Sequence, residues 1–547
     1  MSESSANRLK LFKTEDYWAI WLGLLVVALA MVFFWAGSTL KPWAVTPGKW
    51  STVDQLGKDF AKHGIGYLLV FAGFLSVFTL SMKIMGRNIK EFVPGFIILF
   101  TGALVIFYLA GWSVMKQLDL GAPLLALLIG LIIGNIKAMP AWFNTSLRTE
   151  YYIKTGIVLL GATLPVTLIA EAGPIAFVQA TIVSVTTWTT IYFAATRLFK
   201  LDSRFAAVLG TGGAVCGVSG SIAIGGAIKA DKDHIAIGIG VVSVWAIVMI
   251  FSLAFLTKVM IPSDGNYSHW WNISAGEAGA WVGTSEYADA AGFAVVAELA
   301  TEHGDSPIQT FTLMKVIGRD IWIGIWALVL SIISVVFWEK KKNNDASPEP
   351  QTRGPTGRLG IRVIWDRFPK FVLGFFAASA IMSLVAASAP EKHIGIAPTQ
   401  GTFKSKAQKQ KYKADFSSYQ APTELEKKFS YDDNKKVISF LGKMSIKEYN
   451  ALAAHADDQQ KWALRNLKYK SDWFVSELKA KSIVPIKKLR SWAFVLCFLC
   501  IGLSTRFKDL VKFGLKPFWA FTIGVVVNVP LGWFLTTQVF VNYWRAI

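Results

Sequence analysis

A glycine-rich segment lies inside an apolar stretch of the chain that is long enough to cross a membrane. Residues 210–226 read GTGGAVCGVSGSIAIGG and contain seven glycines. Each glycine destabilises a helix by about 1 kcal/mol relative to alanine, and a membrane span accommodates a break only where freed backbone groups face protein or a water-filled cavity. The segment predicts a broken helix, with candidate substrate-binding residues Thr211, Gly212, Gly213, Cys216, Ser219 and Ser221.

The expected ligand of this break is an anion, because a half-helix presents partial positive charge at its N-terminus. Cys216 would lie at the break as a small residue rather than as a nucleophile. Close packing of small residues against a neighbouring helix is the alternative explanation for the glycines. Seven glycines in seventeen residues exceed what one packing face needs, so we favour the broken helix.

Carboxylates lie in a second apolar segment, residues 276–293. Glu286 and Asp289 are three residues apart and therefore share one face of a helix. Carboxylates inside a membrane are costly and mark ion ligands or proton carriers. We expect both to carry a coupling cation or proton; the alternative is that both lie in a loop at a water-filled vestibule.

The next apolar stretch contributes cations. Lys315 and Arg319 are four residues apart, about one helical turn, and Asp320 follows directly. The guanidinium fork suits a tetrahedral or planar oxyanion, so Arg319 is a candidate substrate ligand. Pairing of these cations with Asp320, Glu286 or Asp289 is the alternative. The two explanations are compatible if the substrate and the carboxylates compete for the same cations. Lys315 and Asp320 are therefore candidates for ion coupling.

The elements that must position these residues are membrane helices. Of 547 residues, 53% are hydrophobic and 17% are charged, with a mean hydropathy of +0.44. Soluble chains carry about 25% charged residues, and a bilayer is crossed by about 20 apolar residues. We predict an all-α polytopic membrane protein with about thirteen spans, near 17–36, 66–82, 93–115, 123–139, 153–171, 175–197, 203–228, 235–258, 277–300, 309–338, 369–389, 491–506 and 515–540.

The formal net charge is +20, and the basic residues responsible for it lie in loops between these spans. Such a distribution orients a membrane protein and contacts anionic lipids, which argues against a nucleic-acid partner. Alternate loops, beginning with the N-terminus, are rich in Lys and Arg, so we expect a cytoplasmic N-terminus in the inner (plasma) membrane. All six histidines lie in loops or at span edges, which argues against a membrane-embedded enzyme; we expect no cofactor and no metal.

Residues 390–489 interrupt the pattern, because they are polar and Lys-rich with helical periodicity. We predict a helical soluble insertion on the extracytoplasmic side, acting as a lid, as a partner-binding module or as a passive element. Residues 343–358 are typical of a flexible cytoplasmic linker.

The segments LLALLIGLIIGN, GIVLLGATLP and VLGTGGAVCGVSGSIAIGGAIKADKDHIAIGIGVVSVWA resemble the YeiH-like sulfate exporter family, and CFLCIGLSTRFKDL is similar to its last crossing segment. This family is grouped with the sodium/proton antiporter and bile-acid symporter superfamily, in which homodimers are common. The resemblance implies two inverted five-helix repeats whose two broken helices cross near the bilayer midplane. The repeats would be 123–258 and 277–389 with 491–540, leaving 1–122 as additional N-terminal helices.

The resemblance also places Ser504 and Thr505 in the second broken helix, as substrate or ion contacts beside those of the first. This chain departs from the family where a His-Glu pair usually follows a Gly-x-Ser, because Glu286, Tyr287 and Ala288 stand there instead. The coupling of protons or ions is therefore expected to differ. The first three spans and the insertion also exceed the family pattern.

These observations together predict a secondary transporter that exports a small anion such as sulfate, sulfite or an organosulfonate. No G-x-x-x-x-G-K-[ST] motif is present, so a proton or sodium gradient would supply the energy. A sodium- or proton-coupled organic-anion importer, or a cation/proton antiporter, is the alternative on the same fold. A membrane receptor or scaffold acting through residues 390–489 is the alternative from another class.

Overall fold

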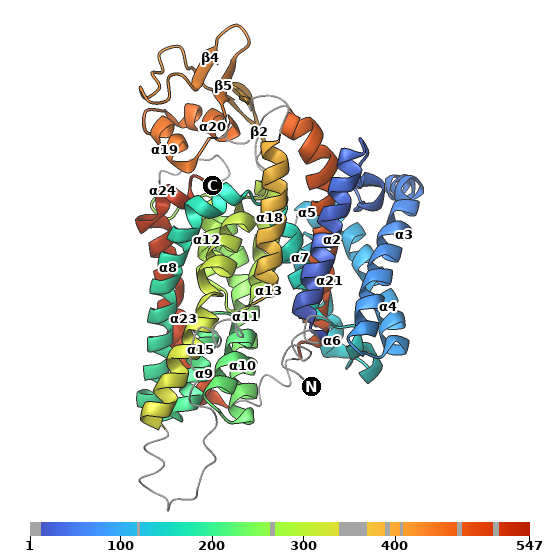
Figure 1. Cartoon of the computed structure of the whole chain (residues 1–547), viewed down its shortest axis with the longest axis vertical. Coiled ribbons are helices and arrows are strands. Elements are labelled where there is room, and N and C mark those ends of the chain that lie inside the picture. The colour runs from blue at the N-terminus through green and yellow to red at the C-terminus, as the bar shows by residue number, and fades with distance from the viewer. Residues whose placement is uncertain are drawn as a thin grey trace, which may run out of the picture.

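The structure is a computed structural model, and it describes residues 13–117, 121–262, 269–338, 369–388, 394–404, 409–442, 444–467, 473–506 and 514–547. Most of these residues are helical, and seven helices are long and apolar enough to cross a membrane. The prediction of an all-α polytopic membrane protein is confirmed. The predicted linker 343–358 lies outside the described residues. Figure 1 shows a bundle of upright helices with a small domain at one end, which we call the domain face; the other end, where α2 begins, is the N-terminal face.

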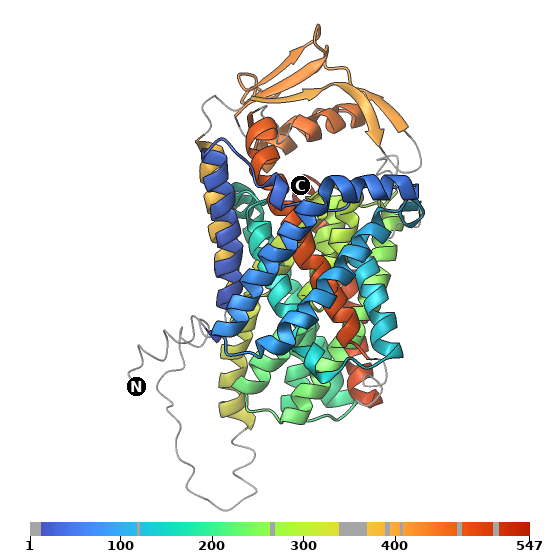
Figure 2. The same cartoon turned by 90° about the vertical axis from the view of Figure 1, so that its right-hand side faces the viewer.

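Three long helices form the N-terminal region, which was predicted as residues 1–122: α2 (Glu15–Trp35), α3 (Val53–Ile84) and α4 (Ile89–Gly111). They lie together along one side of the bundle (Figures 1 and 2). Phe78 of α3 joins them to the rest of the bundle, because its ring packs edge-on against the rings of Tyr151 and Tyr152 in α7 (Thr149–Gly161). The additional N-terminal helices are thus packed against the bundle rather than separate from it.

The glycine-rich segment forms a helical hairpin, hairpin 1, made of α9 (Ser203–Ala214) and α10 (Gly217–Ala227). Its two ends lie together, because Arg204 Nη1 donates to the carbonyl of Lys229 at 3.4 Å and the Phe205 ring stacks on His234 at 4.5 Å. The break at 215–216 was predicted, but the single crossing over 203–228 is wrong. At about 1.5 Å per residue, each half reaches only part-way through a hydrocarbon core of about 30 Å.

A second hairpin, hairpin 2, consists of α12 (Ala275–Ser285) and α13 (Asp289–His303). A Cβ on Gly276 would collide with the carbonyl of Trp544, and one on Gly279 with the carbonyl of Pro307. The chain leaves α13 through Gly304, whose φ of +75° favours glycine, and enters the next helix beside the start of α12. The predicted crossing over 277–300 is therefore also wrong, and this hairpin enters from the domain face, opposite to hairpin 1 (Figure 1).

Long helices surround the hairpins: α8 (Val166–Phe193), α11 (Lys232–Met260), α15 (Trp322–Ile333) and α23 (Leu515–Phe534). The helix that ends in α15 begins as α14 (Ser306–Thr312) and passes through a π-helical segment, η4 (Leu313–Arg319). Such wide turns inside α-helices often occur at functional sites. Here the π-helical segment carries two of the candidate residues, Lys315 and Arg319.

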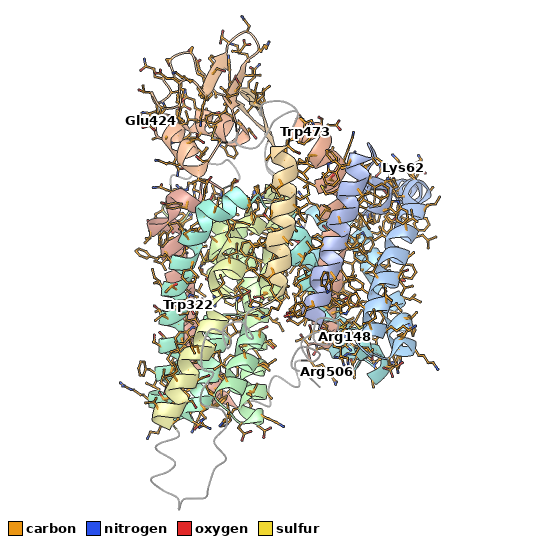
Figure 3. The ribbon with its side chains drawn as sticks, viewed as in Figure 1. Lys62, Arg148, Trp322, Glu424, Trp473 and Arg506 are labelled. Atoms are coloured by element: carbon orange, nitrogen blue, oxygen red, sulfur yellow. The ribbon has the colours of Figure 1, made fainter. Side chains whose placement is uncertain are left out.

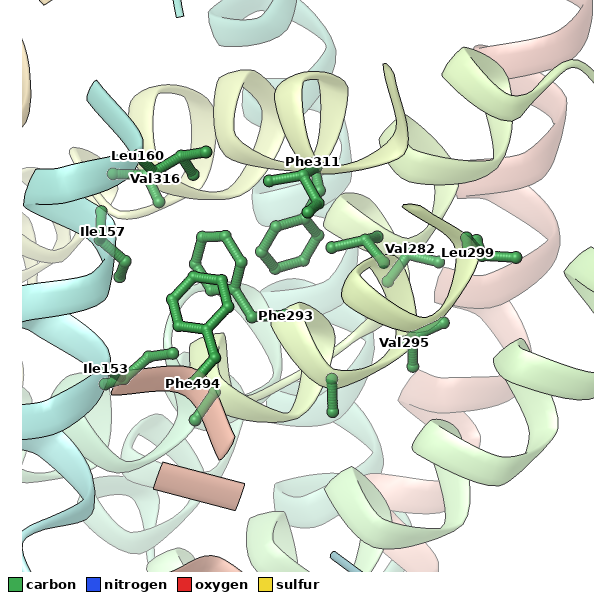
Figure 4. Close-up of a cluster of buried hydrophobic side chains, with 14 of the residues drawn as sticks. Ile153, Ile157, Leu160, Val282, Phe293, Val295, Leu299, Phe311, Val316 and Phe494 are labelled. Carbon is green, nitrogen blue, oxygen red and sulfur yellow. The ribbon is translucent and has the colours of Figure 1, made fainter. Parts of the chain in front are cut away.

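The rest of the bundle is built on α6 (Ala122–Ile136), α7, α18 (Phe371–Ala387) and α21 (Val484–Ser504). Helices α6 and α21 cross in direct contact, since a Cβ on Gly502 would lie 2.5 Å from the carbonyl oxygen of Leu127. Hairpin 2 packs on this part through aromatic rings: Phe293 lies 5.2 Å from Phe494 of α21, and on its other side 4.6 Å from Phe311 of α14 (Figure 4). An apolar interface therefore joins the hairpins to the α6–α21 part.

The insertion contains strands that were not predicted. Strands β1 (Ile394–Pro398), β5 (Val437–Leu441) and β4 (Phe429–Asp432) form an antiparallel sheet in that order, and β2 (Gln400–Lys404) pairs with β3 (Lys409–Lys413). Helices α19 (Ile446–Ala454) and α20 (Asp458–Leu467) complete the domain, and the π-helical η6 (Phe474–Ile483) leads into α21. The prediction of helix is correct for α20 but not for the insertion as a whole, since the described residues also include strands; alternating burial along β5 is the pattern of a half-buried strand.

The domain contacts the membrane-spanning body directly. The backbone N–H of Ile446 donates to Glu171 Oε2 at 2.8 Å, and Asn450 Nδ2 donates to the carbonyl of Asn542 at 3.1 Å. Figure 3 shows Glu424 in the domain, whereas Arg148 and Arg506 lie away from it, toward the N-terminal face. The domain thus covers the end of the body from which hairpin 2 enters.

Candidate functional site

The breaks of the two hairpins meet inside the bundle. The backbone N–H of Gly217, at the start of α10, donates to the carbonyl of Tyr287 in the break of hairpin 2 at 2.6 Å. A Cβ on Gly217 would lie 2.9 Å from that carbonyl oxygen and 2.0 Å from Cγ1 of Val242. Only glycine permits this approach, so at least one of the seven glycines has a defined role in joining the hairpin tips.

Arg319 holds both tips through backbone carbonyls. Its Nε donates to Ala214 at 3.2 Å and its Nη2 to Gly213 at 2.8 Å, in hairpin 1. Its Nη1 reaches hairpin 2, donating to the carbonyls of Gly283 at 3.2 Å, Thr284 at 2.7 Å and Glu286 at 3.0 Å. These carbonyls end α9 and α12, where backbone acceptors have no partner within the helix and the dipole is negative.

Lys315 makes the same kind of bridge one turn earlier. Its Nζ donates to the carbonyls of Val215 at 2.9 Å and Glu286 at 3.0 Å, and its side chain is fully buried. The two cations therefore complete the C-terminal ends of both inward-pointing half-helices. Every nitrogen of the Arg319 guanidinium has a carbonyl acceptor in this conformation, so its role here is to hold the tips rather than to present a free fork to an oxyanion.

The predicted coupling carboxylates converge around these cations. Asp289 begins α13 whereas Glu286 follows the end of α12, so the prediction that both share one helix face is wrong: they flank the break of hairpin 2. The Oδ1 of Asp289 lies 3.7 Å from Lys315 Nζ. Asp320 is 1% exposed; its oxygens have no N–H or hydroxyl donor among the described residues, and its carboxyl lies within hydrogen-bond reach of that of Asp289 when one of the two is protonated. Glu286 is fully buried; its Oε1 accepts from the N–H of Tyr287 at 2.9 Å, and its Oε2 has no donor in the described part of the chain.

Cys216 belongs to this group. Its Sγ, a carboxylate oxygen of Asp289 and one of Asp320 all lie within 4.8 Å of one another. Three elements thus supply the cluster: the break of hairpin 1, the start of α13 and the turn between η4 and α15. Three carboxylates and two cations meet here, so if all are ionised the site carries an excess negative charge that a bound proton or cation must balance.

The predicted hydroxyls lie in hairpin 1 with different environments. Thr211 is buried and donates to the carbonyl of Ala207 within its own helix at 2.7 Å. Ser219 is half-buried in the first turn of α10. Ser221 is fully buried without a hydrogen-bond partner among the described residues. Ser219 is therefore the hydroxyl among these three that is not fully buried, and it lies in the first turn of an inward-pointing half-helix.

Ser504 and Thr505 are not brought to the tips. Helix α21 runs without a break to Ser504, and the Thr505 carbonyl accepts from Asn135 Nδ2 of α6 at 2.9 Å. The second break in the described part of the chain lies in hairpin 2, between α12 and α13.

Sequence reasoning missed Asn528. Its Nδ2 donates to Thr187 Oγ1 at 2.8 Å, and its Oδ1 accepts from the Tyr287 hydroxyl at 3.4 Å. This fully buried amide connects α23 and α8 to the break of hairpin 2. A lone asparagine in the apolar stretch 515–540 was the available signal.

The chain is similar in sequence to a family of membrane proteins. The family model described as Conserved hypothetical protein 698 matches residues 94–396. The UPF0324 membrane protein RB9488 of Rhodopirellula baltica is 32% identical over 353 residues, covering 64% of this chain and 59% of that protein. The UPF0324 membrane protein NE0724 of Nitrosomonas europaea is 29% identical over 419 residues, covering 69% of this chain and 82% of that protein. No solved structure matches the chain.

The match to the Rhodopirellula protein leaves about two fifths of that relative outside the comparison. Both relatives are membrane proteins by name, in agreement with the apolar helices of this chain. The family match includes both hairpins and all of the residues that join their tips. Since it covers more than half of the sequence, the chain belongs to the Conserved hypothetical protein 698 family of YeiH-like membrane proteins, as its glycine-rich segment predicted.

Proposed function

We propose that the protein is a secondary active transporter of a small anion, such as sulfate, sulfite or an organosulfonate, coupled to protons. The observation that carries the proposal is the meeting of two hairpins, entered from opposite faces, at a buried group of charges. Broken helices at a central site are the usual way in which secondary transporters bind polar substrates inside a membrane.

The anion site would lie at the N-termini of α10 and α13, which both begin at the tips. Helix N-termini attract anions because their first N–H groups have no partner within the helix and their dipole is positive; at α10 the N–H of Gly217 is already taken by Tyr287, so an anion would approach the N–H groups that follow it. Ser219, in the first turn of α10, adds a half-buried hydroxyl. Arg319 would support this site indirectly, because it neutralises the opposite, negative helix ends and fixes the breaks in place.

Proton coupling follows from the charge of the site. Asp289 and Asp320 lie close to each other, and an anion entering beside two ionised carboxylates would be repelled. Protonation of this pair removes the repulsion, so proton binding and anion binding would favour each other. We place the N-terminal face in the cytoplasm, because it carries the Lys- and Arg-rich ends of hairpin 1. A divalent anion that leaves with one proton carries one net negative charge, and moving it out of the cell gains about 2.3 kcal/mol per 100 mV of membrane potential. The membrane potential therefore favours export, whereas an inward pH gradient opposes the outward movement of that proton.

A cation/proton antiporter is the second candidate, because the cluster of Cys216, Asp289 and Asp320 could itself hold a cation. Proteoliposomes loaded with a pH dye separate the two. Sulfate, sulfite, taurine and simple carboxylates are each applied with sodium absent, and sodium is applied with these anions absent. A pH change that requires an anion supports the proposal, whereas a change driven by sodium alone contradicts it.

Asp320→Asn is the variant for this assay, and Asp305→Asn is its matched control. Asp305 is a carboxylate at the domain face that pairs with Lys487 at 2.5 Å and takes no part in the tips. We expect Asp320→Asn to uncouple the pH change from anion flux, measured with radiolabelled sulfate, and Asp305→Asn to leave both unchanged. Loss of both signals in the two variants alike would show a folding defect instead of a coupling role.

A further inference from the structure

We propose that Cys216, Asp289 and Asp320 form a binding site for a single divalent metal ion of the zinc class. The three side chains come from hairpin 1, hairpin 2 and the turn before α15, and their ligand atoms lie within 4.8 Å of one another. This site is a property of the folded chain and does not depend on whether the protein transports an anion.

The donor set selects the kind of metal. A thiolate with carboxylates is a ligand combination that Zn²⁺ accepts, with Zn–S of about 2.3 Å and Zn–O of about 2.0–2.2 Å. Sodium and calcium prefer several oxygen ligands, commonly backbone carbonyls. The carbonyls at these breaks already accept hydrogen bonds from Lys315 and Arg319. A soft or borderline dication is therefore the ion that the remaining atoms suit.

Asp320 is the observation that points to a ligand. Its side chain is 1% exposed, and among the residues that the structure describes its carboxylate oxygens have no N–H or hydroxyl donor; their polar neighbour is the carboxyl of Asp289, with which Asp320 can hydrogen-bond only by sharing a proton that a metal ion would displace. Buried carboxylates are ordinarily paired with a cation or coordinate a metal. Arg319 is directed at backbone carbonyls instead, although it precedes Asp320 in sequence. The oxygens of Asp320 are thus available to an ion at the position between the two tips.

Charge balance is compatible with a dication. The charged groups that face this point are Asp289, Asp320, Glu286, Lys315 and Arg319, and the thiol of Cys216 becomes a thiolate when it binds a metal. Three carboxylates and one thiolate, set against the cations of Lys315 and Arg319, leave two negative charges, which one dication neutralises. Lys315 keeps both of its carbonyl acceptors when the metal takes Asp289, so it need not move.

The test uses Co²⁺ as a spectroscopic probe of the purified full-length protein under reducing conditions. We expect one Co²⁺ per chain, with a thiolate-to-cobalt charge-transfer band that one equivalent of Zn²⁺ removes. Cys216→Ser should lose the band, while Cys497→Ser, the matched control in α21, should retain it. Asp320→Asn should weaken Co²⁺ binding by at least about tenfold, since a ligand is lost.

Absence of the charge-transfer band in the folded wild-type protein would overturn the proposal, and so would its persistence in Cys216→Ser. Thermal unfolding of each variant shows whether it is folded. If Cys216→Ser does not fold, Asp320→Asn decides: unchanged Co²⁺ affinity in this variant contradicts the site. Because the readout is binding, absent flux in proteoliposomes would remove the transport proposal and leave this one intact.

Discussion

Gly217 and Tyr287, seventy residues apart in sequence, are joined by a backbone hydrogen bond of 2.6 Å that connects the breaks of two hairpins. This bond makes the tips a single structural unit in the conformation described. Any motion that exposes the site to one face must lengthen it or carry both tips together. The contact is therefore a sensitive place to perturb the proposed transport cycle.

Replacing Gly217 with alanine is expected to destabilise the protein by about 1–3 kcal/mol, as overpacking does. The added Cβ would lie 2.0 Å from Cγ1 of Val242 and 2.9 Å from the Tyr287 carbonyl oxygen. Gly173→Ala in α8 is the control, because a Cβ there meets nothing closer than 3.9 Å. Thermal unfolding and anion flux of both variants are measured. If Gly217→Ala and Gly173→Ala had the same thermal stability and the same anion flux, the close contact between the two hairpin tips would not be needed for either property.

Arg319→Gln is expected to destabilise the protein by at least about 3 kcal/mol, because buried carbonyls lose charged donors. Gly213 and Thr284 are among the carbonyls left without a partner, one in each hairpin. Arg204→Gln is the control, since among the described residues the guanidinium of this half-buried arginine makes a single hydrogen bond, to the carbonyl of Lys229 at 3.4 Å. A folded Arg319→Gln protein with wild-type thermal stability but no anion binding would instead restore Arg319 as a direct anion ligand.

Anion flux should not depend on sodium. The ammonium of Lys315 and the guanidinium of Arg319 already occupy the carbonyls at both breaks, where a sodium ion would otherwise find its ligands. Flux measured in sodium and in choline buffers should therefore be equal at fixed pH. Stimulation by sodium would mean that one of these cations leaves its carbonyls during transport, and would favour the sodium-coupled alternative.

Asp305 provides a prediction on pH that lies outside the membrane-spanning segments. Burial by itself would raise the pKa of Asp305. The nearby cations of Arg490 and Lys487 lower it by more than burial raises it, so the pKa lies below the ordinary value. A carboxyl whose pKa is depressed in the folded state stabilises the protein above its unfolded pKa of about 3.9. That stability is lost as pH falls through the folded pKa.

The melting temperature of the wild type should therefore exceed that of Asp305→Asn at neutral pH, and the difference should disappear in acid. Thermal unfolding of both proteins between neutral and strongly acidic pH measures this. Asp54→Asn is the control, because the ion pair of Asp54 with Lys58 is highly exposed and contributes little. A constant difference between wild type and Asp305→Asn at all pH values would show that the ion pair is not its cause.

The sequence revealed the first break but not its direction. Glycine density around Gly212 and Gly213 exposes the weak point of a helix, whereas 203–228 has the right length for either one crossing or a hairpin. Whether the chain crosses the membrane or turns back depends on the face at which the end of α10 lies. The stacking of Phe205 on His234 shows that it turns back, and this contact is visible only in the folded structure. The short strands of the insertion were missed because lysines obscure their alternation.

The grouping of the candidate residues was predictable, and their roles were less so. Glu286, Asp289, Lys315, Arg319 and Asp320 were selected because charges inside a membrane need a reason, and the structure brings them together. That Arg319 binds carbonyls could not be foreseen, because backbone acceptors at a helix end carry no signal of their own in the sequence.

Removing the insertion domain distinguishes a transporter from a receptor that acts through this domain. Replacing residues 394–467 with a flexible linker should leave anion flux in place, because the hairpin tips and their cations lie in the membrane-spanning body. The thermal stability of the body should fall modestly, since Glu171 loses the N–H of Ile446, and a hydrogen bond to a charged group contributes about 1.5–3 kcal/mol. Glu171→Ala tests this contact alone, with Glu171→Gln as the variant that keeps an acceptor. Complete loss of flux on deletion, in a protein that still folds, would mean that the domain is part of the transport machinery or that the receptor interpretation is correct.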